Sequence, residues 1–245
     1  MTYKFKRILI TGGAGCIGLP LTDELVSRGV EVVVFDLQEQ IKRLESFIHP
    51  QAMKFSGSIL DGAALRDAMN GCDGVVHLAA HLGVQRTERN RLRCLDINIS
   101  GTQKVLDSCA MNGNIKKIVF SSTGSVYGES QIIPTPEDCP MPIQTSLYAA
   151  SKISCESMIQ AYCEGFEFQS WIFRFVSVLG ERYTHGHVID FYSKLKKNPN
   201  KLHVLGNGHQ QKSYIYIQDC ILGMMMGVEK AEVVSSKLLE DENLS

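Results

Sequence analysis

Residues 11–18 (TGGAGCIG) constrain the fold more than any other stretch of the chain. They follow the apolar residues 8–10 and precede residues 19–28, in which apolar side chains recur at helical spacing. Glycines between a strand and a helix let backbone N–H groups approach a phosphate, and the helix N-terminus adds partial positive charge. The stretch therefore predicts a phosphate-binding turn. The alternative is a tight turn that only packs the strand against the helix.

Short β-rich runs alternate with helical stretches over the first 180 residues. The pattern predicts strands at 6–11, 31–36, 74–78, 117–122 and 169–178, and helices at 19–28, 65–69, 95–112 and 147–163. Continuous apolar strands that alternate with helices predict an α/β fold with a doubly wound parallel sheet covered on both faces. Beyond residue 180 we expect a helix near 188–197, short strands at 202–205 and 213–217, and an apolar helix after Asp219.

The second strand ends at Asp36, which bears on the kind of phosphate ligand. An acidic residue at this place accepts both ribose hydroxyls of a dinucleotide and repels a 2′-phosphate. Together with Gly12, Gly15 and Gly18, it predicts a site for NAD rather than NADP.

The segment 148–152 (YAASK) carries a second chemical signal. Residues four apart share one face of a helix, so Lys152 stands beside Tyr148. A free tyrosine, with a pKa of about 10, is a poor base at neutral pH, but a neighbouring ammonium group stabilises the phenolate. Because a hydroxyl-rich strand end, residues 121–123, precedes this pair, we interpret Tyr148 as a general base. A plain surface pair on a helix is the alternative.

Composition narrows the class of protein. The 245 residues carry 25 Lys and Arg against 26 Asp and Glu, so no basic surplus favours nucleic acid. No apolar run reaches the roughly 18 residues that span a bilayer, and the N-terminus shows no signal-peptide pattern. Eight cysteines without a CxxC pair predict a cytoplasmic protein with reduced thiols. His185, His187 and Asp190 could be read as a metal site, but loop histidines beside glycine are seldom ligands, and no metal is expected.

Taken together, TGGAGCIG, Asp36, SSTGSVYGE at 121–129 and YAASK resemble the extended short-chain dehydrogenase/reductase family over residues 6 to about 230. The nucleotide-sugar epimerase/dehydratase group within it, which includes UDP-glucose 4-epimerases, is the most similar. The resemblance implies an NAD-binding Rossmann domain at 1–180 and a small, apparently truncated nucleotide-sugar domain at 181–245. It also implies a homodimer that pairs the helices at 95–112 and 147–163, and a setting in carbohydrate metabolism and polysaccharide biosynthesis.

The resemblance also implies roles for individual residues. The catalytic set falls on Thr123, Tyr148 and Lys152. The cofactor-binding set falls on Gly12, Gly15, Cys16, Ile17, Gly18, Asp36, Leu37, Ser58, Ile59, Leu78, Ala79, Ala80, Asn98, Ser121, Tyr148, Lys152 and Phe175. The substrate-binding set falls on Thr123, Gly124, Ser125, Tyr148, Ser177 and Lys212.

The turn after Thr123 favours one reaction. Family members that dehydrate nucleotide sugars resemble one another in carrying Asp-Glu there, and decarboxylating members carry Glu, whereas this chain has Gly124-Ser125. Elimination needs a second proton donor and acceptor, while epimerisation at C4 through a transient 4-keto sugar needs one base and the cofactor. We therefore expect an NAD-dependent 4-epimerase of a UDP-hexose or UDP-hexuronic acid. A nucleotide-sugar dehydrogenase or reductase, or an NAD-binding member with little catalysis, is the alternative.

Three departures from the family pattern bear on binding. Ser58 stands where relatives commonly have Asp near adenine, and Ser177 stands where many epimerases have Asn. Lys212 replaces an Arg on the sugar-nucleotide phosphates, which leaves a point charge without a bidentate fork. The chain also ends before the region in which relatives place another phosphate-binding Arg.

Overall fold

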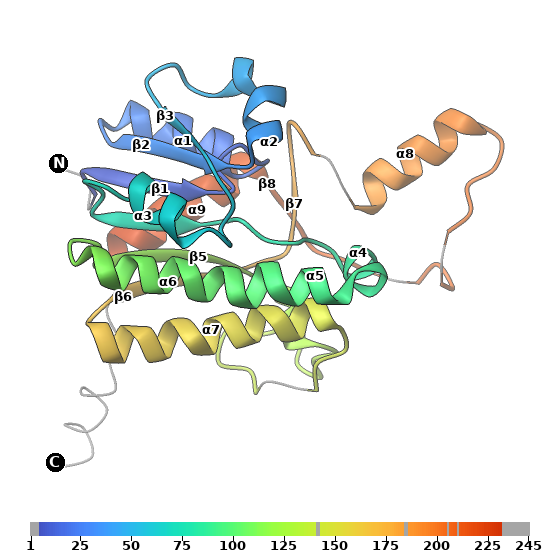
Figure 1. Ribbon diagram of the computed structural model, residues 1–245. Coiled ribbons are helices and arrows are strands. Elements are labelled where there is room, and N and C mark those ends of the chain that lie inside the picture. Colours follow the sequence, from blue (N-terminus) through green and yellow to red (C-terminus); the bar gives the residue numbers. More distant parts are fainter. Residues whose placement is uncertain (1–4, 141–142, 184–185, 205, 210, 232–245) are drawn as a thin grey trace, which may run out of the picture.

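The computed structural model describes residues 5–140, 143–183, 186–204, 206–209 and 211–231. Six strands form one parallel sheet in the order β3-β2-β1-β4-β5-β6 (Figure 1). They are β1 (Arg7–Thr11), β2 (Glu31–Asp36), β3 (Met53–Ser56), β4 (Gly74–His77), β5 (Lys117–Thr123) and β6 (Gln169–Phe175). The doubly wound parallel sheet predicted from the sequence is confirmed.

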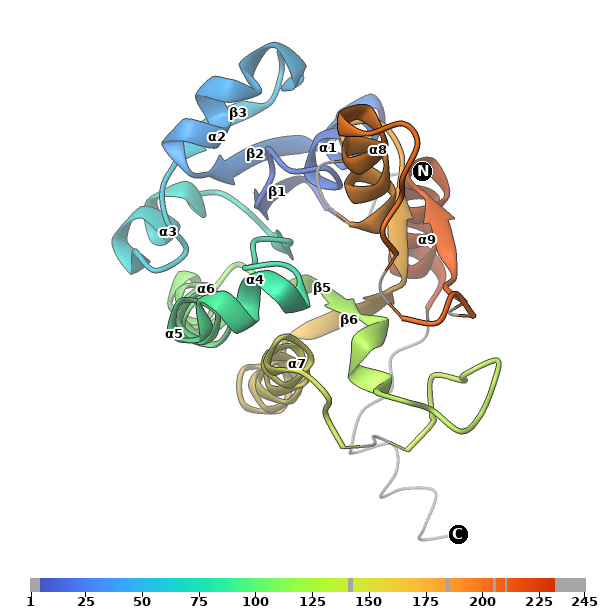
Figure 2. The same ribbon diagram turned by 90° about the vertical axis from the view of Figure 1, so that its right-hand side faces the viewer.

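Helices cover both faces of this sheet (Figure 2). One core cluster joins β1 and β2 to α1 (Gly18–Ser27) and α9 (Ile217–Lys230). The other joins the opposite face to α3 (Gly62–Ala68), α6 (Gly101–Asn112) and α7 (Leu147–Phe166). Apolar residues on both faces of the strands explain the continuous hydrophobic runs in their sequences, because each strand is buried from two sides.

Shorter elements connect or follow the strands. They are α2 (Gln38–Arg43), a 3-10 turn (Glu45–Phe47), α4 (Val84–Arg89), α5 (Arg91–Leu95), a π-helical turn (Asp96–Ser100), a second 3-10 turn (Gly124–Tyr127), β7 (Ser177–Leu179), α8 (His187–Lys197) and β8 (Tyr214–Tyr216). Strands β7 and β8 pair in parallel as a separate two-stranded sheet. Within the described part of the chain, no helix is long and apolar enough to cross a membrane.

Several sequence predictions of secondary structure were wrong in detail. The single helix expected at 95–112 is α5, the π-helical turn and α6 in succession. The strand expected at 169–178 divides at Val176 into β6 and β7, which belong to different sheets. Residues 202–204 form no strand, and residue 205 lies outside the described residues. Strand β3 was not predicted, because MKFS is an edge strand whose residues are mostly exposed, so its sequence lacks an apolar run.

Helices α8 and α9 behave differently, although both lie within the range predicted as a second domain. Helix α9 buries Ile217, Cys220 and Met224 in the same core cluster as β1. Helix α8 extends away from the body in Figure 1, and none of its residues, all of them described, is buried. The domain boundary at residue 180 stays a prediction.

Candidate active site

The glycine-rich turn between β1 and α1 is as tight as its sequence predicts. Gly12 has a φ of +68°, and a Cβ there would lie 2.8 Å from the backbone nitrogen of Ala79. A Cβ on Gly18 would lie 2.5 Å from the carbonyl oxygen of Gly13. Side chains at these positions would push the turn away from β4 and from the start of α1. The turn therefore needs glycine for its own geometry as well as for a ligand.

The N-terminus of α1 is available to an anion. Among the described residues, no side chain hydrogen-bonds to the first N–H groups of α1 from its N-cap position, Ile17, and the first turn contains no acidic residue. Leu19 N–H bonds the Gly15 carbonyl oxygen at 3.1 Å and Pro20 has no N–H, so it is chiefly the helix dipole that favours a negative group at this place. Cys16 and Ile17 lie at this end of the turn, and their contact with a cofactor stays a prediction.

Asp36 lies directly beside the glycine-rich turn. Its Oδ2 accepts a hydrogen bond from the Ala14 backbone N–H at 3.1 Å, and its Oδ1 accepts one from the Leu37 N–H at 2.8 Å. Burial raises the pKa of Asp36, while these two bonds and the nearby Arg43 lower it. The two backbone bonds fix the carboxylate at the carboxyl end of β2, where ribose hydroxyls would be donors.

Tyr148 and Thr123 meet at the carboxyl end of β5. The Thr123 side chain is close enough to the hydroxyl of Tyr148 to lower its pKa, but burial has the larger effect and raises the pKa of Tyr148 to about 12. Thr123 also accepts a hydrogen bond from the Ser125 backbone N–H at 3.2 Å and donates to the Ser125 hydroxyl at 3.2 Å. Thr123 thus joins the 3-10 turn at Gly124–Tyr127 to the first turn of α7. Tyr148 is a neutral phenol until something stabilises its phenolate.

Lys152 lies one helical turn further along α7 and is 2% exposed. Its Nζ donates to the Ser121 carbonyl oxygen at 2.6 Å and lies 4.4 Å from the centroid of the Phe120 ring. Burial lowers the pKa of Lys152 to about 8, against the opposing effects of Cys155 and Glu156. The ammonium form therefore still dominates at neutral pH.

Asn98 lies in the π-helical turn and connects three segments. Its Oδ1 accepts from the His81 backbone N–H at 2.7 Å, and its Nδ2 donates to the Ser151 hydroxyl at 2.9 Å. Residues 79–81 follow β4, so these bonds hold the predicted cofactor-lining segment against α7. The widened turn places Asn98 where a regular helix over 95–112 would not, and this is why the sequence prediction missed its shape.

His77 and Thr102 are buried residues that the sequence analysis did not assign to the site. His77 Nδ1 lies 2.7 Å from Thr11 Oγ1, and its Nε2 lies 2.9 Å from Thr102 Oγ1. Burial, with a further contribution from the charge of Lys152, lowers the pKa of His77 to about 3. The imidazole is therefore neutral and acts as a bridge that fixes β1, β4 and α6 beneath the site.

A buried ion pair supports α7 and was not predicted from the sequence. Glu156, 2% exposed, bonds Arg174 Nη2 at 2.8 Å and accepts from the Ser122 hydroxyl. Arg174 Nη1 donates to the Tyr127 hydroxyl at 2.8 Å and to the Glu137 carbonyl oxygen at 3.0 Å. The spacing 148, 152, 156 was a usable signal, because these residues share one face of α7.

The remaining predicted cofactor residues lie at the carboxyl edge of the sheet or next to it. The Leu78 N–H bonds the Thr11 carbonyl oxygen at 3.0 Å, and Ala80 follows in the same segment. Ser58 accepts from the Leu60 N–H at 3.2 Å, while Ile59 is buried under Gly101. Phe175 is paired with Thr123 in the β5–β6 register. Their contacts with a cofactor stay predictions.

The predicted substrate residues are less closely grouped. Gly124 and Ser125 form the 3-10 turn beside Thr123, and Ser177 begins β7, paired with Tyr214 of β8. Lys212 is exposed and precedes β8. Their roles toward a substrate stay predictions.

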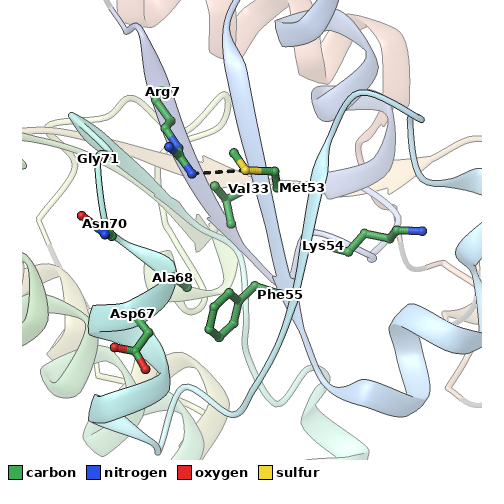
Figure 3. Close-up of a pocket in the computed structure, with 9 residues that line it drawn as sticks. All are labelled: Arg7, Val33, Met53, Lys54, Phe55, Asp67, Ala68, Asn70 and Gly71. Atoms are coloured by element: carbon green, nitrogen blue, oxygen red, sulfur yellow. Dashed lines mark hydrogen bonds between the residues drawn. The ribbon is translucent and has the colours of Figure 1, made fainter.

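Two features lie apart from this site. The described residues hold no group of three or more His, Cys, Asp or Glu side chains that would bind a metal; His185 lies outside them, and His187 contacts Tyr214. A surface pocket of about 290 Å³ opens at the amino ends of β1 and β3 (Figure 3). Arg7, Met53 and Phe55 line it, and Lys54 points away from them. It lies at the opposite end of the sheet from Thr123 and Tyr148.

Comparison with known proteins identifies the family of this chain. Residues 8–238 match the model of the NAD dependent epimerase/dehydratase family. The chain belongs to that family. This epimerase/dehydratase is 32% identical over 226 residues to a UDP-N-acetyl-alpha-D-glucosaminuronate decarboxylase of Bacillus cytotoxicus. The aligned region covers 88% of this chain and 69% of the relative. dTDP-D-glucose 4,6-dehydratases, one of them from Dictyostelium discoideum, are also among its relatives.

Solved structures of epimerases share the fold of this family member. A UDP-galactose 4-epimerase matches with a TM-score of 0.81 and 33% identity, over 94% of this chain and 74% of that one. A UDP-glucose 4-epimerase of Thermus thermophilus in complex with NAD matches with a TM-score of 0.82 and 28% identity, over 92% of this chain and 75% of that one. The NAD cofactor predicted from the sequence is thereby confirmed.

The residues of this epimerase/dehydratase fit NAD on structural grounds as well. The glycine-rich turn leaves no room for Cβ atoms, the N-terminus of α1 turns the positive end of its dipole toward a pyrophosphate, and Asp36 offers acceptors to a ribose. An adenosine 2′-phosphate would meet the carboxylate of Asp36, which disfavours NADP.

Proposed function

We propose that this chain is an NAD-dependent 4-epimerase of a nucleotide sugar, a UDP-hexose or a UDP-hexuronic acid. The observation that carries the proposal is that Tyr148 lies close to Thr123, one helical turn before the buried Lys152, and that the turn after Thr123 offers no carboxylate. One base at the sugar is sufficient for epimerisation, whereas dehydration needs an acid and a base in addition. The relatives include decarboxylases and dehydratases, so the choice rests on this turn.

Tyr148 would remove the proton of the C4 hydroxyl, with Thr123 holding the phenol oxygen in place. Bound NAD supplies the oxidation and re-reduction of C4, together with a positive charge close to the reacting groups. Burial keeps the pKa of Tyr148 near 12, so its phenolate depends on these positive charges. Lys152 is fixed by Ser121 and contributes one of them.

Epimerisation also requires that the sugar turn over between the two transfers. Interactions with the nucleotide diphosphate, remote from C4, would hold the substrate while the pyranose ring is released to rotate. Lys212 and Ser177 would contribute to this remote binding. Gly124 has no side chain to obstruct the rotating ring, and Ser125 offers only a hydroxyl.

A homodimer through α6 and α7 is part of this proposal. Met111 on α6 is 70% exposed and Phe166 on α7 is 47% exposed, so both helices offer apolar surface. Apolar residues on paired helices favour a symmetric contact between two copies. We place the enzyme in the cytoplasm and in polysaccharide biosynthesis.

The test is an incubation of the purified chain with NAD⁺ and, separately, UDP-glucose, UDP-N-acetylglucosamine and UDP-glucuronic acid. Products are separated by chromatography while absorbance of reduced nicotinamide is followed. We expect a C4 epimer without net NADH, and no product from Tyr148→Phe. Net NADH would identify a dehydrogenase instead. Bound NAD without any product would identify a member with little catalysis.

A further inference from the structure

The segment that follows β7 crosses to the glycine-rich turn, although 165 positions separate the two in sequence. The Cys16 thiol donates to the Glu181 carbonyl oxygen across 3.7 Å, a weak hydrogen bond that ties the segment to the start of α1. Gly180 packs so closely on Ile217 that a Cβ would lie 2.2 Å from its Cγ2. The path of residues 180–182 is therefore fixed from both sides.

Arg182 adopts an unusual backbone conformation in this segment. Its φ is +62°, in the left-handed region that residues with a Cβ seldom occupy. Strain of this kind persists where the surroundings impose it, and it is concentrated at functional sites. The conformation determines where the guanidinium group lies.

That guanidinium group lies between two parts of the cofactor edge. Its Cζ is 4.8 Å from the centroid of the Phe47 ring, in the 3-10 turn that follows α2. It is also close enough to Cys16 to lower the pKa of that thiol, against the larger effect of burial, which raises it. Among the described residues, Arg182 makes no ion pair within 4.0 Å. A half-buried cation without a carboxylate partner thus stands beside the N-terminus of α1.

We propose that Arg182 is a pyrophosphate-binding residue, and that residues 180–182 form a clasp over the cofactor that slows its release. A guanidinium group pairs with phosphate through two parallel hydrogen bonds, which an N-terminal helix dipole alone does not supply. Phe47 holds the guanidinium plane while the pyrophosphate is bound. Slow release suits an enzyme that regenerates its cofactor at every turnover. The clasp itself rests on NAD binding and not on the choice of reaction.

The test measures cofactor release and needs no turnover. The full chain is loaded with NADH, excess NAD⁺ is added, and the decay of nicotinamide fluorescence gives the dissociation rate. We expect Arg182→Gln to accelerate release by about tenfold or more, the usual effect of losing a charge-assisted hydrogen bond. Arg66→Gln, on the exposed side of α3, is the matched control and leaves the rate unchanged. Arg182→Lys gives an intermediate rate, because it keeps the charge and loses the fork.

A second variant separates the contact from backbone strain. Arg182→Gly relieves the positive φ and removes the side chain, so it unfolds no more readily than the wild type and still releases NADH quickly. Calorimetric titration with ADP and with adenosine then shows whether Arg182 contacts the phosphates. Because adenosine has no phosphate, we expect only the affinity for ADP to fall in Arg182→Gln. Unchanged NADH release in Arg182→Gln, or an equal loss of affinity for ADP and adenosine, overturns the proposal. Failure of the epimerase assay with a clasp that behaves as expected contradicts only the proposed reaction.

Discussion

The ammonium group of Lys152 lies 2.6 Å from the carbonyl oxygen of Ser121, so the middle of α7 is bound directly to the carboxyl end of β5. The Phe120 ring supports the same group from below at 4.4 Å. One turn earlier on the helix, Tyr148 lies close to Thr123 at the end of the same strand. The two residues predicted to carry the chemistry are thus positioned by one strand and one helix.

Lys152→Met should separate catalysis from stability. Burial lowers the pKa of Lys152 to about 8, whereas a lysine in an unfolded chain has a pKa of about 10.4. Keeping the charge buried therefore costs free energy at neutral pH. We expect the free energy of unfolding of Lys152→Met at pH 7 to equal or exceed that of the wild type, while turnover falls by about 100-fold or more. Urea denaturation and activity assays on one preparation check both.

The pH dependence of the free energy of unfolding is a second test of this prediction. Between pH 8 and about 10.4 the unfolded chain binds more protons than the folded one at this position, so the wild type gains stability with rising pH. Lys152→Met lacks that gain. A variant that is much less stable than the wild type at pH 7 would show that the ammonium group contributes to folding, contrary to this account.

His77 should make the fold sensitive to acid. Burial lowers its pKa to about 3, and an unfolded histidine has a pKa of about 6.5. The contribution of neutral His77 to the free energy of unfolding is fully present above pH 6.5. It is lost as the pH falls toward 3, by about 1.4 kcal/mol per pH unit. His77→Gln is expected to be less stable at pH 7 and to show a flatter decline between pH 6 and 4. His203→Gln, at an exposed position, should follow the wild-type curve.

The contrast between Tyr148 and His77 shows which parts of the site the sequence could predict. Tyr148 and Lys152 are four residues apart on one helix, and Asp36 ends a recognisable strand, so local spacing was sufficient to find them. His77 acts through Thr11 and Thr102, which are 66 and 25 positions away. No local pattern reveals such partners, because only the packed sheet brings them together.

Two elements show the same limit for the fold. Helix α9 was predicted as an apolar helix, but that it returns to cover β1 depends on contacts over about two hundred residues. The π-helical turn at Asp96–Ser100 replaces regular helix, and its sequence DINIS contains no proline or glycine that would indicate a break. Long-range packing determines the position of α9, and the hydrogen bonds of Asn98 stabilise the π-helical turn. Propensity alone could therefore predict neither.

Two glycine variants should distinguish a glycine that the glycine-rich turn requires from one that α7 does not require. Gly18→Ala places a Cβ 2.5 Å from the Gly13 carbonyl oxygen, so we expect lower stability and weaker NAD binding. Gly165 of α7 has no described atom within 4 Å of its Cβ position. Gly165→Ala should therefore stabilise the protein by roughly 0.5–1 kcal/mol, because alanine favours the helix. Thermal unfolding with and without NAD tests the pair, and equal behaviour of the two variants would contradict the assignment.

The Glu156–Arg174 pair should behave as one unit. Removing either partner leaves the other charge poorly compensated, which costs about 3 kcal/mol in buried pairs. Arg174 is 20% exposed, whereas Glu156 is buried. In Arg174→Met, Glu156 keeps the hydrogen bond from the Ser122 hydroxyl. Arg174→Met is therefore the milder of the two variants only if that bond is sufficient for the buried carboxylate. We expect each single variant, Glu156→Gln and Arg174→Met, to be clearly destabilised in urea. The double variant should lose less than the sum of the two, and strict additivity would show that the pair is not coupled.

Thr123→Val should raise the pH at which the enzyme works. Thr123 lowers the pKa of Tyr148 against the larger effect of burial, and valine keeps the volume while removing the hydroxyl. The phenolate then forms at a higher pH, so we expect turnover at pH 7 to fall by about ten- to a hundredfold and the rising limb of the pH profile to move upward. NADH affinity should be nearly unchanged, because the glycine-rich turn and Asp36 are untouched. Thr123→Ser keeps the hydroxyl and should retain the wild-type profile. A loss of turnover without a shift of the profile would mean that Thr123 positions the sugar and does not tune Tyr148.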